Sequence, residues 1–301
     1  MSTMLPMADP RQGPGEPPPF ERIAVAGYGL IGASLGLAIK ARWPSALLIA
    51  IDRKDVIETA MRMGAADVGG DDLVLAAEAQ LVVLAAPILT NNSILAELAD
   101  HVPGSALVTD VGSTKRQTVA AARVLPERLR FIGGHPLAGA AVGGIEAARP
   151  DLFNGRPWLL TPGNQHTADD AARLQSMLEA LGAAVRTLTP ETHDRLTAYI
   201  SHLPQLVATS LMQVVGAGAG DDGLALAGRG LRDTTRLASS PAAVWRDILV
   251  TNSDNIARAM DEMVEVLRRV KGDGPPGDDF TATFDSAAAW KRALEQHFEG
   301  P

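Results

Sequence analysis

Residues 22–32, RIAVAGYGLIG, decide the fold of this chain. The apolar run at 23–26 is typical of a buried strand, and Gly27, Gly29 and Gly32 follow it directly before a helical pattern. Glycines at these spacings permit a tight turn, a close approach of the backbone to a pyrophosphate, and close packing of the helix on the strand. We therefore predict a strand, a turn and a helix that together bind a dinucleotide.

The same alternation of strand and helix continues outward from this stretch. Helical patterns follow at residues 30–41, 56–63 and 93–100, and further short apolar runs lie at residues 47–52, 81–87, 106–112, 129–136, 156–162 and 183–190. Their strands are continuously apolar, which is typical of a sheet covered by helices on both faces. We predict an α/β fold with a doubly wound, mostly parallel, Rossmann-like sheet.

The pattern changes near residue 189, after which only helical periodicity remains. Long helices are expected at 191–215, with Pro204 as a kink or break, at 241–271, and at 284–298 after a linker at 272–279. We predict a dinucleotide-binding domain at 21–189 and an all-helical second domain at 190–301. Residues 1–20, rich in Pro and Gly, are expected to form a flexible tail.

Composition narrows the function classes. The 301 residues carry a net charge of -8 with dispersed basic residues, which argues against a nucleic-acid partner. The longest apolar run, 81–89, is too short for a membrane span, which needs about 20 residues. The chain has no cysteine and its start lacks the apolar region of a signal peptide, so we expect a cytoplasmic protein. An apolar face on the long helices makes a homodimer plausible.

The second predicted strand ends in Asp52, 20 residues after Gly32. A carboxylate at this place accepts hydrogen bonds from the ribose hydroxyls and repels a 2'-phosphate, so it favours NAD over NADP. Arg53 is the counter-signal, since it could hold a 2'-phosphate or simply be a solvated surface residue. The predicted cofactor-binding residues are Gly27, Tyr28, Gly29, Leu30, Ile31, Gly32, Asp52, Arg53, Ala86 and Pro87.

Two polar clusters follow later strands, DVGSTK at 110–115 and GGHPLAG at 133–139. Carboxyl ends of parallel strands meet at one edge of the sheet, so both clusters are expected beside the nicotinamide. His135 could accept a proton from a carbinol as hydride departs, or it could be a loop histidine that only bonds backbone. Ser113 could act beside it, or could be a helix N-cap.

At this point the motifs carry a family resemblance. GYGLIG, DVGSTK, GGHPLAG, HDRLTAYISHLP and GLRDTTRLASSPAAVWRDILVTN, in this order across 22–270, resemble the signatures of prephenate and arogenate (cyclohexadienyl) dehydrogenases. The resemblance implies NAD-dependent oxidative decarboxylation of prephenate to 4-hydroxyphenylpyruvate in tyrosine biosynthesis. It also implies a nucleotide-binding domain followed by a helical domain that dimerises.

The resemblance also implies roles for single residues. His135 matches the catalytic histidine and Ser113 its partner, while Arg236 matches an arginine that grips a substrate carboxylate. His193 and His202 match histidines that line the substrate side of the cleft. Substrate contacts are also expected from Gln205 and from Arg232. Arg232 stands four residues before Arg236, so it would lie on the same helix face; its alternative role is a surface salt bridge.

Departures from the family pattern bear on the substrate. Gln205 stands where many members have histidine, and Ala140, Ala141 and Val142 replace a polar or acidic pair. An acidic group would bind the amino group of arogenate, so its absence favours prephenate, although Glu146 could compensate. Arogenate, dual specificity and a 4-amino analogue stay open as alternatives.

Other functions fit the residues less well. A β-hydroxyacid dehydrogenase would need a lysine early in the helical domain, and residues 189–270 contain none. A noncatalytic NAD-responsive regulator would leave the cluster at His135 without a purpose. No metal site is expected, since His193 and His202 are nine residues apart, roughly opposite on an ideal helix.

Overall fold

The structure is a computed structural model that describes residues 17–139, 143–163, 166–272 and 277–298. The predicted apolar loop at 140–142 and residues 273–276 of the predicted linker at 272–279 therefore lie outside the described residues. Among the described residues, no helix has the length and apolar character needed to cross a membrane.

One sheet organises the first part of the chain. Within the described residues it has eight strands in the order β3-β2-β1-β4-β5-β6-β7-β8, and every neighbouring pair is parallel except β6 and β7. This order confirms the predicted doubly wound, mostly parallel sheet. Strands β2 and β3 lie on one side of β1 and the later strands on the other, so the strand order switches between β1 and β4. The strands are β1 (Arg22–Ala26), β2 (Leu47–Ile51), β3 (Val68–Gly70), β4 (Leu81–Leu84), β5 (Ala106–Asp110), β6 (Leu129–Pro136), β7 (Pro157–Pro162) and β8 (Ala184–Thr187).

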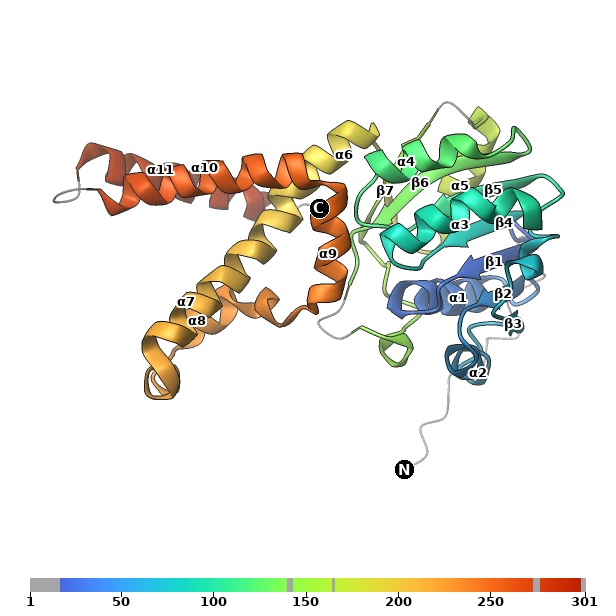
Figure 1. The fold of residues 1–301 in the computed structure, drawn as a ribbon, viewed down its shortest axis with the longest axis horizontal. Coiled ribbons are helices and arrows are strands. Elements are labelled where there is room, and N and C mark those ends of the chain that lie inside the picture. Colours follow the sequence, from blue (N-terminus) through green and yellow to red (C-terminus); the bar gives the residue numbers. More distant parts are fainter. Residues whose placement is uncertain (1–16, 140–142, 164–165, 273–276, 299–301) are drawn as a thin grey trace.

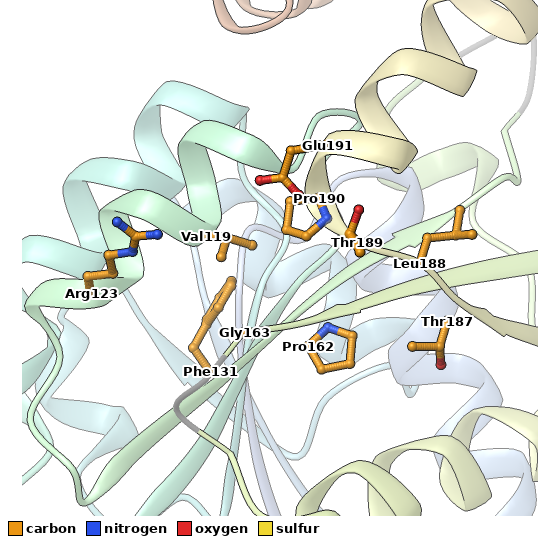
Figure 2. A pocket seen from close by; sticks show the side chains of 10 residues that line it. All are labelled: Val119, Arg123, Phe131, Pro162, Gly163, Thr187, Leu188, Thr189, Pro190 and Glu191. Carbon is orange, nitrogen blue, oxygen red and sulfur yellow. The ribbon is translucent and has the colours of Figure 1, made fainter.

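The antiparallel strand β7 ends where β6 begins, and a pocket of about 800 Å³ opens there. Figure 2 shows its lining, which comes from the helical segment after β5, the start of β6, the end of β7, and residues 187–191. Phe131, near the start of β6, lines this pocket, whereas His135 lies near the other end of the same strand. The pocket is therefore separate from the edge of the sheet where the predicted site residues gather.

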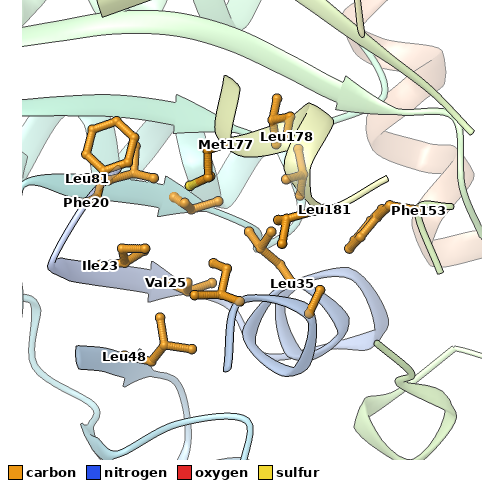
Figure 3. Packing of buried hydrophobic residues seen from close by; sticks show 14 of the residues in the cluster. Phe20, Ile23, Val25, Leu35, Leu48, Leu81, Phe153, Met177, Leu178 and Leu181 are labelled. Carbon is orange, nitrogen blue, oxygen red and sulfur yellow. The ribbon is translucent and has the colours of Figure 1, made fainter. Parts of the chain in front are cut away.

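Helices cover both faces of the sheet, as its apolar strands predicted. Along β1, Ile23 and Val25 point into one core, while Ala24 and Ala26 point into the other. Helices α1 and α5 pack on the first core (Figure 3), and α3 with η2 packs on the second. The helical elements here are α1 (Leu30–Arg42), α2 (Lys54–Arg62), η1 (Leu73–Ala76), α3 (Ile88–His101), α4 (Arg116–Ala121), η2 (Ala122–Val124), η3 (Ile145–Ala147) and α5 (Ala168–Ala180).

The end of the predicted flexible tail is part of this core. Phe20 is 1% exposed, the guanidinium of Arg173 lies 4.0 Å from the centre of its ring, and the Arg173 Nε donates to the Pro19 carbonyl at 2.6 Å. Burial of this aromatic ring fixes the chain just before β1. The tail was therefore predicted too long at its end, since residues 19 and 20 are held by packing.

From Pro190 onward, every element that the structure describes is helical. These elements are α6 (Pro190–Thr197), the π-helix η4 (Ala198–His202), α7 (Leu203–Ala225), α8 (Arg229–Thr234), η5 (Arg236–Ser239), α9 (Ala242–Thr251), α10 (Ser253–Lys271) and α11 (Asp278–Phe298). Figure 1 shows them extending to one side of the sheet, with α10 and α11 running back along each other. The break predicted at Pro204 is instead a π-helix just before it, because proline is tolerated in the first turn of α7, where its missing N–H is not needed.

A small apolar cluster joins the helices to the sheet. Ile88, at the start of α3, packs with Ala198, Ile248 and Ile256, all of which are buried. The same junction carries hydrogen bonds, including one between the hydroxyl oxygens of Thr114 and Thr251 at 2.7 Å. The helical part is thus held against the carboxyl edge of the sheet.

Candidate functional site

The turn between β1 and α1 has the geometry that its glycines predicted. Gly27 has φ of +98°, and a Cβ there would lie 2.4 Å from the Ala86 backbone nitrogen. A Cβ at Gly32 would lie 2.0 Å from the Gly27 carbonyl oxygen, so Gly32 lets the helix approach the turn. At Gly29 nothing lies within 4 Å of an added Cβ, which leaves open space beside the first turn of α1. A phosphate fits this place, since the helix N-terminus presents free N–H groups.

A pocket of about 870 Å³ extends from this turn along the carboxyl ends of β1, β2 and β4. Seven of the ten predicted cofactor residues line it: Gly27, Tyr28, Gly29, Asp52, Arg53, Ala86 and Pro87. The other three, Leu30, Ile31 and Gly32, form the first turn of α1 and are not among the lining residues. The pocket has the position and the donor groups that a dinucleotide requires.

Asp52 is oriented by the backbone around it. Its carboxylate accepts the Tyr28 N–H at 2.6 Å and the Arg53 N–H at 2.7 Å, and it lines the pocket. The Arg53 guanidinium is exposed and lies 3.6 Å from the Asp55 carboxylate. The acidic pocket wall thus fits ribose hydroxyls. The nearby anion of Arg53 is a carboxylate of the protein itself, that of Asp55.

A buried carboxylate brings the two predicted catalytic segments together. Asp110, at the end of β5, accepts the Gly112 N–H at 2.9 Å and the Gly134 N–H at 3.0 Å. The first of these bonds orders the loop that carries Ser113, and the second fixes the end of β6 just before His135. Asp110 is also paired with Lys115, and both side chains are fully buried.

Ser113 is half-buried and is not a helix N-cap. The N-cap of α4 is Lys115, and Ser113 has no side-chain hydrogen bond within the described residues. Its hydroxyl is therefore available to a ligand at the carboxyl end of β5. This strand is the neighbour of β4 in the sheet, and the nucleotide pocket lies at the carboxyl end of β4.

Three side chains form a hydrogen-bonded line through the centre of the site. His135 Nδ1 and His193 Nε2 are 2.8 Å apart, and His193 Nδ1 and an Asp194 carboxylate oxygen are also 2.8 Å apart. Burial lowers the pKa of His135 well below 6.5, and the neighbouring His193, Lys115 and His202 lower it further. His135 is thus neutral at neutral pH, the state in which a histidine accepts a proton.

His193 has a different position from the one that its motif implied. It is fully buried, and both of its ring nitrogens are bonded inside the protein, one to His135 and one to Asp194. The prediction that it lines the substrate side of the cleft is therefore wrong for this structure, because no ring nitrogen is left for a substrate.

His202 retains a free polar atom. Its Nδ1 lies 3.4 Å from the Asn252 side-chain nitrogen, its Nε2 is buried with no hydrogen-bond partner within the described residues, and burial lowers its pKa to about 4. The same Asn252 nitrogen donates to the Asp194 carbonyl at 2.8 Å, so one amide lies between His202 and the backbone next to His193. The π-helix η4 between them changes the rotation per residue, which the ideal-helix argument could not include.

Gln205 and the two arginines also differ from the expectation. Gln205 is buried, its amide donates to the Leu237 carbonyl at 2.8 Å, and it accepts from the Ser240 hydroxyl at 3.1 Å. It thereby holds η5, the element that Arg236 begins, instead of presenting a free amide. Arg232 and Arg236 do not share one helix, because α8 ends at Thr234. Both are exposed and have no ion pair within the described residues.

Glu146, which was considered as a partner for a substrate amino group, lies at the nucleotide pocket. It is exposed on η3 and lines the nucleotide pocket. Its carboxylate is thus near the cofactor-binding residues, and its position gives no support for a partner to a substrate amino group.

Sequence reasoning missed four polar residues of the site: Asp110, Lys115, Asp194 and Asn252. Each lies inside a motif quoted above, but the motif gave no signal of its partner. The direct succession of His193 and Asp194 was one available clue, since a carboxylate next to a histidine in a helix can reach its ring. The others act through contacts between segments far apart in the chain.

Comparisons with known proteins agree with this geometry. A family model described as the nucleotide-binding domain of prephenate dehydrogenase matches residues 35–187, and one described as its dimerization domain matches residues 189–272. The first match begins after the glycine turn, so the turn and the family match are separate observations.

Three relatives show the extent of the likeness. The prephenate dehydrogenase of Bacillus subtilis is 38% identical over 257 residues, which cover 83% of this chain and 69% of that protein. The structure of Synechocystis arogenate dehydrogenase is 32% identical with a TM-score of 0.71, covering 91% of this chain and 96% of that one. The Aquifex aeolicus prephenate dehydrogenase, solved with hydroxyphenyl propionate and NAD+, is 25% identical with a TM-score of 0.80, covering 93% and 98%. This chain belongs to the prephenate dehydrogenase family, as its ordered motifs predicted.

Proposed function

We propose that this chain catalyses the NAD-dependent oxidative decarboxylation of prephenate to 4-hydroxyphenylpyruvate. The observation that carries the proposal is the buried His135 at the carboxyl end of β6, on the same edge of the sheet as the ends of β1, β2 and β4 that line the nucleotide pocket. Its lowered pKa keeps it neutral and ready to accept a proton. The family match and the fit of the turn at Gly27 and of Asp52 to NAD support the same reaction.

In the proposed reaction, His135 removes the proton from the ring hydroxyl. Its Nδ1 is bonded to His193, so Nε2 is the nitrogen that faces the substrate. NAD, when bound, supplies the hydride acceptor. As the hydroxyl-bearing carbon becomes a carbonyl, the bond to the ring carboxylate breaks, and its electron pair moves through the two ring double bonds to the carbonyl oxygen. The products are carbon dioxide and a phenolate, which takes up a proton from water to become the phenol, and aromatisation drives the step.

The proposed substrate contacts follow from groups that the protein leaves free. Ser113 orients the hydroxyl against His135, and its own hydroxyl has no partner within the described residues. His202 offers its unpartnered Nε2, and Arg236 offers a planar guanidinium suited to a carboxylate. Arg232 supplies a second positive charge for a substrate that carries two carboxylates.

We also propose that residues 190–301 form the substrate and dimerisation domain of a homodimer. Support comes from the match of residues 189–272 to a dimerization domain and from large apolar side chains exposed on these helices. Val214 is 69% exposed and Leu226 is 88% exposed, and apolar surface of this kind marks an interaction face. Light scattering after size exclusion tests this directly, and a monomer at micromolar concentration would contradict it.

The experiment that tests the function compares substrates side by side. NADH formation is measured with prephenate, arogenate and a β-hydroxyacid, and we expect the highest kcat/KM with prephenate. Arogenate is the second candidate, because the Synechocystis relative of that name is 32% identical. Higher kcat/KM with arogenate would reverse the choice of substrate, and reduction of NAD only with the β-hydroxyacid would overturn the proposed reaction.

A further inference from the structure

The proposed reaction gives a role to His135, one of two buried histidines that are hydrogen-bonded together. It gives none to the other histidine, His193, or to the buried carboxylate of Asp194 to which His193 is bonded. Asp194, on α6, is fully buried and accepts two backbone N–H groups from the start of α4, from Lys115 at 2.7 Å and from Arg116 at 2.9 Å. Burial alone would raise the pKa of Asp194, but the hydrogen bonds from His193 and from these two N–H groups lower it overall. The carboxyl group is therefore ionised and can only accept hydrogen bonds.

An ionised Asp194 determines the proton positions on both histidines. Since the carboxylate only accepts, His193 must donate to it from Nδ1. A neutral His193 then has a lone pair on Nε2, so His135 must donate to it from Nδ1. A neutral His135 with its proton on Nδ1 has its lone pair on Nε2, the nitrogen that has no hydrogen bond within the described residues.

We propose that Asp194 is a positioning residue that, through His193, holds His135 in the tautomer whose Nε2 accepts the substrate proton. The proposal rests on the function proposed above, in which His135 is the base. Asp194 touches neither substrate nor cofactor in this account, and its effect on the reaction passes entirely through the two imidazole rings.

The charged groups around the line of residues are consistent with neutral rings. His135 faces His193 on α6, Lys115 after β5, and His202 on η4, and each of them lowers its pKa in addition to burial. Burial lowers the pKa of His193, and Lys115 lowers it further, against the opposing effects of Asp194 and Asp110. Lys115 is itself paired with Asp110, and this ion pair holds the Lys115 ammonium group in place.

The arrangement also assists the charged state that forms during the reaction. When the substrate O–H bond breaks, its proton joins His135 at Nε2 and the ring becomes an imidazolium that still carries its Nδ1 proton. The hydrogen bond to His193, which is itself bonded to the Asp194 carboxylate, stabilises that charge. No proton needs to reach Asp194, and His135 returns to its starting state by releasing the Nε2 proton to water after the product leaves.

The principal test is Asp194→Asn. A carboxamide nitrogen facing His193 donates where the carboxylate accepted, which reverses both tautomers and places a proton on His135 Nε2. In catalytic triads the same exchange lowers kcat by about 10,000-fold through the wrong tautomer, so we expect a loss of at least about 100-fold here. The KM for prephenate and the Kd for NAD should change little, because Asp194 contacts neither.

Asp254→Asn is the matched control. Asp254 pairs with Arg116, which also contacts Asp194, but in the described part of the chain no contact joins Asp254 to a histidine. Its replacement weakens the same link between sheet and helices and should leave kcat within about twofold, since exposed ion pairs contribute little. Equal kcat values in wild type, Asp194→Asn and Asp254→Asn would overturn the proposal.

A second pair of variants decides the question if Asp194→Asn does not fold. The side-chain oxygen of Gln in His193→Gln can accept from His135 Nδ1, as the imidazole Nε2 does, whereas His193→Leu has no acceptor. We expect the Gln variant to have at least about tenfold higher kcat than the Leu variant, a fraction of the 100-fold to 10,000-fold that a positioned general base contributes. Equal kcat values in the two would overturn the proposal.

A measurement without substrate separates this inference from the proposed function. In the full-length protein labelled with 15N-histidine, the ring nitrogen shifts should show the His135 proton on Nδ1, and a wild-type proton on Nε2 would overturn the proposal. If His135→Asn kept wild-type turnover, the base itself would be wrong. If His135→Asn were inactive while Asp194→Asn and His193→Leu were fully active, only the role of Asp194 would be lost.

Discussion

The nucleotide end and the reaction end of the site are built in different ways. The nucleotide end depends on a turn and two strand ends between residues 27 and 53, where Gly27 and Gly32 are required by backbone atoms nearby in the chain or after the neighbouring strand. The reaction end joins His135 to His193 of α6, at a sequence separation of 58 residues, and Arg116 to Asp254 of α10, at a separation of 138 residues. The difference teaches that the family's cofactor geometry is a local property, whereas its acid-base chemistry depends on how the helical part docks on the sheet.

The strongest way to separate the two ends is His135→Asn. We expect kcat to fall by about 1,000-fold, because general base catalysis supplies 100-fold to 10,000-fold. The Kd for NAD, measured by fluorescence quenching, should stay within about twofold, because His135 is not among the residues that line the nucleotide pocket. A parallel loss of NAD affinity would mean that the two ends are not independent.

Acid should destabilise the reaction end selectively. His202 has a pKa of about 4 in the folded state against 6.5 as its ordinary value, so the unfolded state binds more protons between these pH values. Its contribution to stability is fully present above pH 6.5 and is lost as the pH falls toward 4, by about 3 kcal/mol at 1.36 kcal/mol per pKa unit. His135 and His193 act in the same direction.

Denaturant unfolding of wild type and His202→Gln at several pH values measures this contribution. The free energy of unfolding of the variant should fall less between pH 6.5 and 4 than that of the wild type. His297→Gln, at an exposed position on α11, is the control and should follow the wild type. Parallel curves for all three proteins would show that the burial of His202 is not linked to stability.

Arg236→Ala sharpens the comparison on the substrate side. A lost hydrogen-bonded charge contact of about 2 kcal/mol should raise the KM for prephenate about 30-fold with a smaller change in kcat. Arg236→Lys keeps the charge but not the planar fork and should recover only part of the loss. An unchanged KM in steady-state kinetics would remove Arg236 from the substrate site.

Asp52→Ser tests the nucleotide end alone, with the smallest expected effect. Loss of the carboxylate should lower the ratio of kcat/KM for NAD to that for NADP by about tenfold, the value of one ribose hydrogen bond to a charged group. Arg53→Ala is the control, since its guanidinium lies near Asp55 at the surface. A loss of NADP use in Arg53→Ala would instead identify Arg53 as a 2'-phosphate ligand.

The same contrast explains what the sequence could and could not predict. The sheet, its helices and seven of the cofactor-pocket residues were predictable because strand periodicity and the turn at Gly27 and Gly29 are local patterns. The short strand β3 was missed, since three residues give no periodicity. The ends of elements were less accurate, as for α11, which begins six residues before the predicted helix.

The arrangement at the reaction end could not be predicted in the same way. Motif resemblance predicted substrate contacts for His193 and Gln205, but their hydrogen bonds are made inside the protein, to Asp194 and to η5. The relation of His193 to His202 depends on a π-helix, and a count of residues on an ideal helix gives the wrong phase. Such contacts follow from docking of the two parts of the chain, which no single segment encodes.

The most direct test of the central claim is the stoichiometry of a single turnover with enzyme in excess of prephenate. The proposed reaction predicts one NADH, one carbon dioxide and one 4-hydroxyphenylpyruvate for each prephenate consumed, all formed at the same rate. NADH formed without carbon dioxide, or carbon dioxide formed without NADH, would contradict an oxidative decarboxylation at His135.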